Sequence, residues 1–257
     1  MKILFYPHAL VTFAEAYCII KKLGIIHTNN VNDKEIGLAF YWNTTTISQY
    51  PKELVTLENA GIKVLNKIPD VSKECVDRVF QSVFGYSSLI NPETHRGNCV
   101  KKTNTQAVHD GVMQMCPCKA EPKFIYQRII DSRLTNEKVY DLRTIIVNRK
   151  IVQVTMLVKG VEGCFGRTKA GNKVSVFTCQ TLDPNKCYSK EEIGLIETFA
   201  EKFGCDLAHL DIVRNNYDGK LFILDVNNIS AYLSYTRLID QTAVFNKVVT
   251  AFKNAYL

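Results

Sequence analysis

The stretch that most constrains this chain is Leu221–Asn228, an apolar run that ends in acidic and amide residues. Side chains alternate between the faces of a strand, so we expect Asp225 and Asn227 to share one face with Ile223. The other face would hold Phe222, Leu224 and Val226. Carboxylate and amide oxygens two residues apart are suitable ligands for a hard divalent cation. The alternative is local, because Asp and Asn also end strands and begin turns.

A second strand, Ala208–Val213, precedes this run across the turn sequence Asn215–Gly219 and predicts a β-hairpin. Antiparallel pairing brings His209 and Asp211 beside Asp225 and Asn227. Two adjacent carboxylates repel unless a charge neutralises them, and Mg²⁺ bound to nucleotide phosphates would do so. The alternative is that Asp211 lies on a solvated face.

Two basic positions are candidates for phosphate binding. Arg143 lies on a predicted hairpin that pairs residues 141–147 with 151–158, and a planar guanidinium held on a strand suits phosphate oxygens. A salt bridge to a nearby carboxylate is the alternative for Arg143. Lys101 and Lys102 end a strand before a polar loop, residues 103–111, so one of them points inward, where an ammonium needs an anionic partner. Otherwise the two form a basic pair on a surface strand.

The remaining elements alternate in type. Strands at 2–6, 36–41 and 63–65 alternate with helices at 13–23 and 52–60, which predicts a small open α/β unit. A helix at 72–84 follows, then strands at 99–102 and 123–127. Ser189 caps a helix at 190–203, and an amphipathic helix at 240–255 closes the chain.

Composition excludes several classes of protein. The net charge of +7 and pI of about 8.8 favour an anionic partner, but the basic residues are scattered, which favours phosphate-bearing ligands over nucleic acid. Nine irregularly spaced cysteines indicate reduced thiols and a cytoplasmic setting. No signal peptide or membrane span is expected. Residues 166–173 lack the ending of a Walker A motif, and Gly-x-Gly-x-x-Gly is absent.

In this order, the elements resemble the ATP-grasp superfamily over nearly the whole chain. The most specific part is the C-terminal hairpin, with an Asp in its first strand, an Asp-Gly turn and a second strand that ends Asp-Val-Asn. The resemblance implies an α+β and α/β fold with three parts. These are an N-terminal α/β domain at 1–70, a small subdomain at 71–127 and a C-terminal subdomain at 128–257.

The resemblance also implies a role for each matching residue. Lys102 would contact the α- or β-phosphate, and Arg143 the transferring phosphate. Asp131 would reach the ribose, and Lys159 is a further phosphate candidate. The hinge that meets adenine would comprise Gln127, Arg128 and Ile129, and the Mg²⁺ ligands would be Asp211, Asp225 and Asn227.

The implied activity is a Mg²⁺-ATP-dependent carboxylate-amine (or thiol) ligase that forms an acyl phosphate and releases ADP and phosphate. Its partners would be a small-molecule, peptide or glycan carboxylate and an amine acceptor, and an oligomer is compatible with the sequence. Two departures from the family pattern, the single glycine in the loop at 103–111 and His209, favour an alternative: a phosphotransferase or a nucleotide-binding protein without turnover. A basic polyanion-binding protein is a second alternative, which rests on charge alone.

Overall fold

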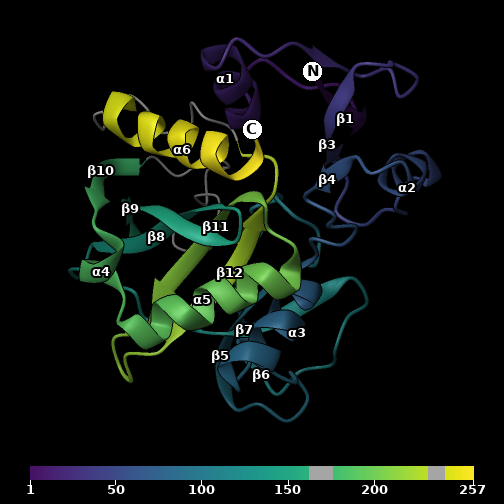
Figure 1. Cartoon of the computed structure of the whole chain (residues 1–257). Coiled ribbons are helices and arrows are strands. Elements are labelled where there is room, and N and C mark those ends of the chain that lie inside the picture. Colours follow the sequence, from purple (N-terminus) through teal and green to yellow (C-terminus); the bar gives the residue numbers. More distant parts are fainter. Residues whose placement is uncertain (162–175, 231–240) are drawn as a thin grey trace.

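The computed structural model describes residues 1–161, 176–230 and 241–257 (Figure 1). Its first unit is a parallel sheet of four strands in the order β2-β1-β3-β4. Three of these strands and both helices of the unit were predicted, whereas β2, with two residues, was not. The elements are β1 (Lys2–Pro7), α1 (Glu15–Lys22), β2 (His27–Thr28), β3 (Ile36–Trp42), α2 (Lys52–Asn59) and β4 (Lys63–Leu65).

The second unit consists of helix α3 (Lys73–Phe84) and an antiparallel sheet in the order β6-β5-β7. Its strands are β5 (Gly97–Thr103), β6 (Val112–Cys116) and β7 (Phe124–Arg128). The Ser72 side chain accepts from the Cys75 backbone N at 3.3 Å, and Gly85 ends the helix with φ of 80°, as the predicted helix boundaries required. The strand β6 was not predicted.

The third unit is a five-stranded sheet in the order β10-β9-β8-β11-β12, with the two predicted hairpins at its centre and edge. Its elements are β8 (Lys138–Val147), β9 (Lys150–Gly160), β10 (Val176–Leu182), α4 (Pro184–Cys187), α5 (Lys190–Phe203), β11 (Leu207–Arg214), β12 (Leu221–Asn227) and α6 (Gln241–Tyr256). Ser189 and Glu192 form a reciprocal capping box at the start of α5, as predicted.

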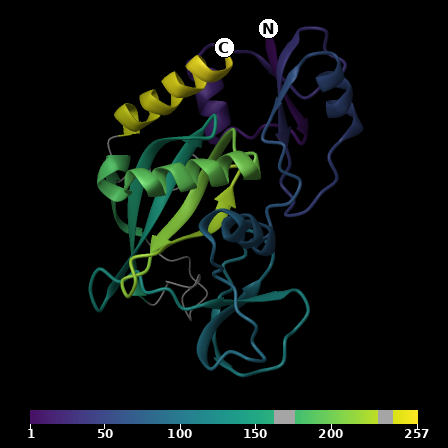
Figure 2. The same cartoon turned by 60° about the horizontal axis from the view of Figure 1, so that its bottom comes forward.

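The two faces of this sheet bury different helices (Figures 1 and 2). Ile146 of β8 packs in one apolar core with Phe80 of α3 and Phe199 of α5. The adjacent Ile145 belongs to a second core, with Phe252 of α6 and Phe40 of β3. Alternation along β8 therefore joins the large sheet to α3 and α5 on one side and to α6 and the first unit on the other.

The edge strand β12 departs from the alternation that we expected. Asp211 lies opposite Asp225, but the next pair is Ile212 with Ile223, so Leu224 is an extra residue in the ladder. Ile223 is consequently buried in the same core as Phe222, and the prediction that these two residues face opposite environments was wrong. The irregularity sits directly before the acidic end of the strand.

No helix among the described residues has the length and apolar character needed to cross a membrane.

Candidate functional site

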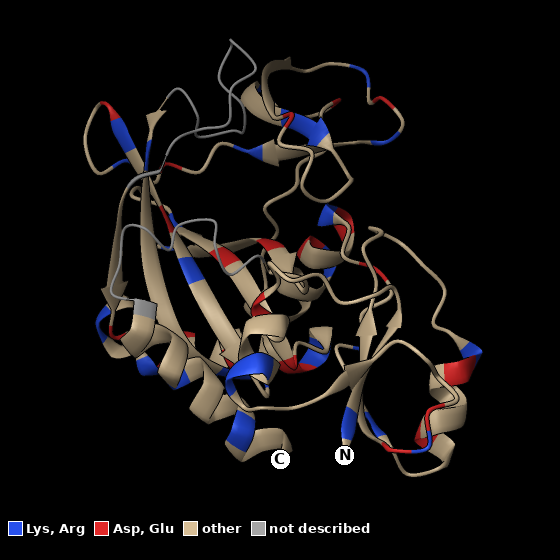
Figure 3. Cartoon of the chain, turned by 90° about the horizontal axis from the view of Figure 1, so that it is seen from above, with Lys and Arg blue, Asp and Glu red and all other residues tan. Residues whose placement is uncertain are grey.

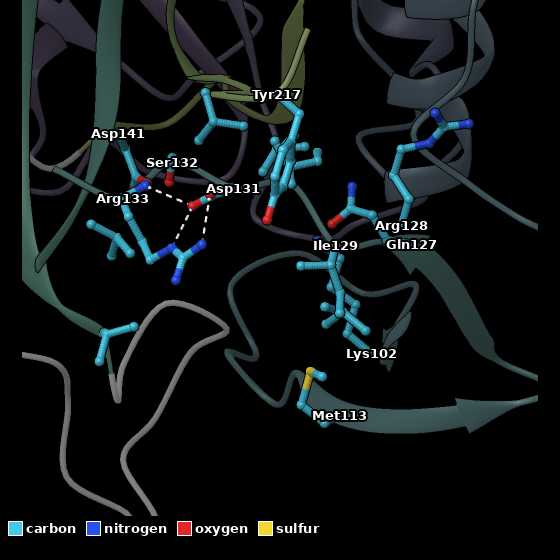
Figure 4. Close-up of a pocket in the computed structure, with 16 residues that line it drawn as sticks. Lys102, Met113, Gln127, Arg128, Ile129, Asp131, Ser132, Arg133, Asp141 and Tyr217 are labelled. Atoms are coloured by element: carbon cyan, nitrogen blue, oxygen red, sulfur yellow. Dashed lines mark hydrogen bonds and ion pairs between the residues drawn. The ribbon is translucent and has the colours of Figure 1, made fainter. Parts of the chain in front are cut away.

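A cavity of about 480 Å³ lies where the β6-β5-β7 sheet faces the large sheet. Five residues predicted to bind nucleotide line it, and Figure 4 shows their side chains around the cavity. They are Lys102, Gln127, Arg128, Ile129 and Asp131. Register explains part of the arrangement, because Val100 pairs with Gln127 and Lys102 lies two residues further along β5, so all three share one face.

Asp211, Asp225 and Asn227 converge on neighbouring strands, as the sequence predicted. Asp211 is directly opposite Asp225, and Asn227 Nδ2 donates to Asp211 Oδ2 at 3.2 Å. Burial and then the Asp211 charge raise the pKa of Asp225 to about 6. His209 of β11 is directly opposite Asn227 of β12. Its Nε2 lies 2.7 Å from Oε2 of the buried Glu15.

Arg143 lies on β8, which pairs with β11 on the side away from β12. It is directly opposite Asp211, and its Nε is 2.6 Å from Asp211 Oδ1. This is the salt bridge that we kept as the alternative for Arg143. The contact places the guanidinium beside the acidic pair, so the same residue is within reach of any phosphate bound there.

The inward lysine is Lys102, and Lys101 lies on the opposite face of β5. Lys101 Nζ is 2.5 Å from Glu121 Oε1, whereas Lys102 forms no ion pair within the described part of the chain. Burial and then the nearby Lys73 lower the pKa of Lys102 to about 8, against the opposing effect of Asp225.

Lys73 is a site residue that sequence reasoning missed. It begins α3, and burial lowers its pKa while the charges of Asp225 and Asp110 raise it. Its Nζ donates to the Thr105 carbonyl of the loop that follows β5. A signal was present in the sequence, because the helix dipole disfavours a cation in the first turn of a helix.

The loop at 103–111 reaches both flanking units through Gln106, a second residue that we had not singled out. Gln106 Nε2 donates to the Val226 carbonyl at 2.7 Å, between the two site residues of β12. Its backbone N donates to Thr46 Oγ1 of the first unit at 3.1 Å. The loop is thereby held against the acidic end of β12.

Two residues predicted to contact the nucleotide, Asp131 and Lys159, already form ion pairs with neighbouring side chains. Asp131 accepts from Arg133 Nε at 2.8 Å and from a second guanidinium nitrogen at 2.9 Å (Figure 4), and this pairing lowers its pKa. Lys159 of β9 is paired with Asp141 of β8, which itself lines the cavity. In Figure 3 the ribbon positions of basic and acidic residues are interspersed along the chain. A bound nucleotide that contacts Asp131 or Lys159 would have to replace the ion pair with Arg133 or with Asp141.

The donor set suits a hard cation supplied together with other oxygen ligands. Asp211 and Asp225 present two carboxylates, and Asn227 would add an amide oxygen once its amide, whose nitrogen now faces Asp211, turns over. Among the described residues, no cluster of three or more His, Cys, Asp or Glu side chains could hold a metal. A cation here would thus need oxygens from a bound molecule, such as phosphates.

No protein-family model and no curated protein sequence matches the chain. Solved structures do match it along its length. PsnB, an ATP-grasp ligase complexed with a minimal precursor, Mg and ADP, matches with a TM-score of 0.55 and 11% identity over 98% of this chain and 96% of that chain. D-cycloserine synthetase DcsG gives 0.53 and 12% over 98% and 99%.

A third match is a RiPP-associated ATP-grasp ligase from Chryseobacterium gregarium, in complex with ADP and with a leader and core peptide. It has a TM-score of 0.54 and 14% identity over 98% of this chain and 96% of that chain. Each of these three matches covers 98% of this chain and therefore extends over all three units of the fold. The chain has the ATP-grasp fold.

Proposed function

We propose that this protein binds Mg²⁺-ATP in the cavity and is an ATP-dependent ligase that joins a carboxylate to an amine. The observation that carries the proposal is a cluster of charges next to the cavity. Lys102, which lines the cavity, and Lys73 lie near Asp225, and Asp225 is opposite Asp211, which is paired with Arg143. Polyphosphate with its cation supplies charges of both signs, so it would pair with the partly buried lysines and Asp225 and would replace the ion pair between Arg143 and Asp211.

The residues of the chain would act by position and charge. Lys102 and Lys73 would hold phosphate oxygens, and Arg143 would leave Asp211 to contact the phosphate that is transferred to the substrate carboxylate. Asp211, Asp225 and Asn227 would hold Mg²⁺, which neutralises charge on the phosphates. The amine would then displace phosphate from the acyl phosphate, with ADP and phosphate released. No nucleophilic side chain is required.

The structural neighbours indicate which class of substrate to test first. Two of them were solved with precursor or leader and core peptides, and one is a synthetase of a small molecule. We therefore favour a peptide carboxylate as the first substrate class to test, with small carboxylates second.

The decisive experiment measures ADP release in the presence of peptide and small-molecule carboxylates with an amine. Asp225→Ala is expected to lose ADP release at least about 100-fold, because one removed charge-stabilising group costs that much in comparable sites. The matched control is Asp218→Ala, in the exposed turn of the same hairpin. Full activity in Asp225→Ala would refute the assignment.

One observation favours the alternative of nucleotide binding without turnover. In the loop at 103–111, Ala107 and His109 have φ of 59° and 56°, a conformation that favours glycine, and Gln106 fastens the loop to β12. Calorimetry separates the two functions. ADP and Mg²⁺ binding without ADP production on any carboxylate would support the binding protein.

A further inference from the structure

A buried chain of hydrogen bonds lies behind the β7 wall of the cavity. The Ser88 hydroxyl is 2.7 Å from Asp77 Oδ1 of α3, and Gln127 Nε2 of β7 is 2.9 Å from the same hydroxyl oxygen. Asp77, Ser88 and Gln127 are 6%, 2% and 6% exposed, respectively. The hydrogen bonds link helix α3 to the C-terminal end of strand β7.

The donors around Asp77 determine which atom donates in each of these hydrogen bonds. Asp77 also accepts from the Ser88 backbone N at 2.7 Å and from Ser87 Oγ at 2.5 Å, so donors face both of its oxygens and it acts as an acceptor. The single Ser88 hydroxyl proton must therefore go to Asp77. Ser88 can then only accept from Gln127.

It follows that the amide nitrogen of Gln127 faces Ser88 and the amide oxygen faces away from it. The choice between the two ends of an amide rests on such a network, and here the network allows one answer. Gln127 lines the cavity, and in Figure 4 its amide oxygen lies on the side of Tyr217. That wall of the cavity is therefore a hydrogen-bond acceptor.

We propose that Asp77 and Ser88 are positioning residues that lock the Gln127 amide oxygen toward the cavity, so that the site selects a nucleobase with an exocyclic amino group over one with a carbonyl. The proposal rests on the proposed function, since it requires a nucleotide base in this cavity. A 6-amino purine donates to the locked oxygen, whereas a 6-oxo purine would bring two acceptors together.

The test compares ADP with inosine diphosphate, which carry the same phosphates and differ at the 6-position and the neighbouring ring nitrogen. Calorimetry with Mg²⁺ is expected to show ADP binding at least about tenfold more tightly to the native protein, the effect of one mismatched hydrogen bond. Ser88→Ala releases the amide to rotate, so this ratio should fall to about threefold or less.

Two further variants sharpen the test. Ser87→Ala removes a hydrogen bond to the same Asp77 carboxylate without touching Gln127, and it should keep the native ratio. Asp77→Ala removes the acceptor of the Ser88 hydroxyl, which frees this hydroxyl to donate to Gln127, and the ratio should shift toward inosine diphosphate. Circular dichroism and melting temperature establish that each variant is folded.

If Ser88→Ala does not fold, Gln127→Met replaces it, because this side chain of similar length has no strong acceptor, and the ratio should again collapse. An unchanged ratio in either variant overturns the proposal. Equal binding of the two nucleotides by the native protein also overturns it but leaves the proposed function standing. Binding of neither nucleotide overturns both.

Discussion

Arg143 of β8 and Asp211 of β11 lie directly opposite each other, with Nε 2.6 Å from Oδ1. The side chain predicted to contact phosphate therefore neutralises the carboxylate predicted to hold the metal. Arg143 cannot contact phosphate, and Asp211 cannot hold the metal, while the two side chains are paired. The ion pair must therefore open when phosphate and metal bind. In the nucleotide-free protein, Arg143 would thus limit the affinity for Mg²⁺ alone.

Removing this arginine should expose the acidic pair. In Arg143→Ala, Asp211 loses its ion-pair partner and the repulsion between Asp211 and Asp225 is less compensated, so we expect Mg²⁺ alone to raise the melting temperature more than it does in the native protein. Ligase activity should be lost at the same time. Arg96→Ala, which removes an exposed arginine, is the control. An equal effect of Mg²⁺ on Arg143→Ala and on the native protein would contradict this interpretation of the ion pair.

Nucleotide binding should take up protons near pH 8. Burial and Lys73 lower the pKa of Lys102 to about 8, so about half of this lysine is neutral at that pH, and a bound phosphate raises the pKa again. Calorimetric titration with ADP in two buffers of different ionisation enthalpy measures the uptake. We expect it to vanish in Lys102→Met and to persist in Lys101→Met, whose lysine lies on the opposite face of the same strand. Uptake that persists in Lys102→Met would assign the proton to another group.

Asp225→Asn should stabilise the nucleotide-free protein while abolishing activity. The folded pKa of about 6 lies above the unfolded value of 3.8, so the folded state binds the extra proton and stability falls as pH rises through this window. Above pH 6 the ionised group costs at most about 3 kcal/mol. The variant should therefore have a higher melting temperature than the native protein above pH 6, and the gain should disappear below pH 4. A gain independent of pH would exclude this origin.

The elements that the sequence predicted accurately carry local signals. Helix α5 begins and ends where its Ser189 capping box and Gly204 require, and the β11–β12 register follows from the turn at 215–219 and the apolar pattern. The pairing of Asp211 with Asp225 requires in addition the extra residue Leu224 in β12, because the register set at the turn would otherwise place Leu224 opposite Asp211. These features depend on residues close together in the chain.

The features that were missed depend on distant partners. Strand β6 is short, without alternation of polar and apolar residues, and it forms by antiparallel pairing with β5. Lys73 approaches Asp225 only because α3 packs on β12. Ser88 and Gln127 are 39 residues apart. Nothing in the periodicity of either segment could have placed that hydrogen bond, because the tertiary fold determines it.

Asn66 shows how the first unit is attached to the strands of the site, and it supplies the last prediction. It is 1% exposed and has a φ of 53°. Its amide oxygen accepts from the backbone N of Asp206 and Leu207 at 3.0 and 2.8 Å, and its amide nitrogen donates to the carbonyls of Leu207 and Asn228 at 2.8 and 3.2 Å. A single side chain thus satisfies four buried backbone groups.

Asn66→Ala leaves those groups without partners and puts alanine in a left-handed conformation, so we expect unfolding to become easier by about 3 kcal/mol. The control is Asn148→Ala, which has φ of 49° in an exposed turn and tests the conformational cost alone. Chemical denaturation measures both variants. Because Asn228 follows Asn227, the Asn66 variant should also bind Mg²⁺-ADP more weakly than the control variant does. Equal losses of stability in the two variants would show that backbone strain, and not the buried hydrogen bonds, makes Asn66 important.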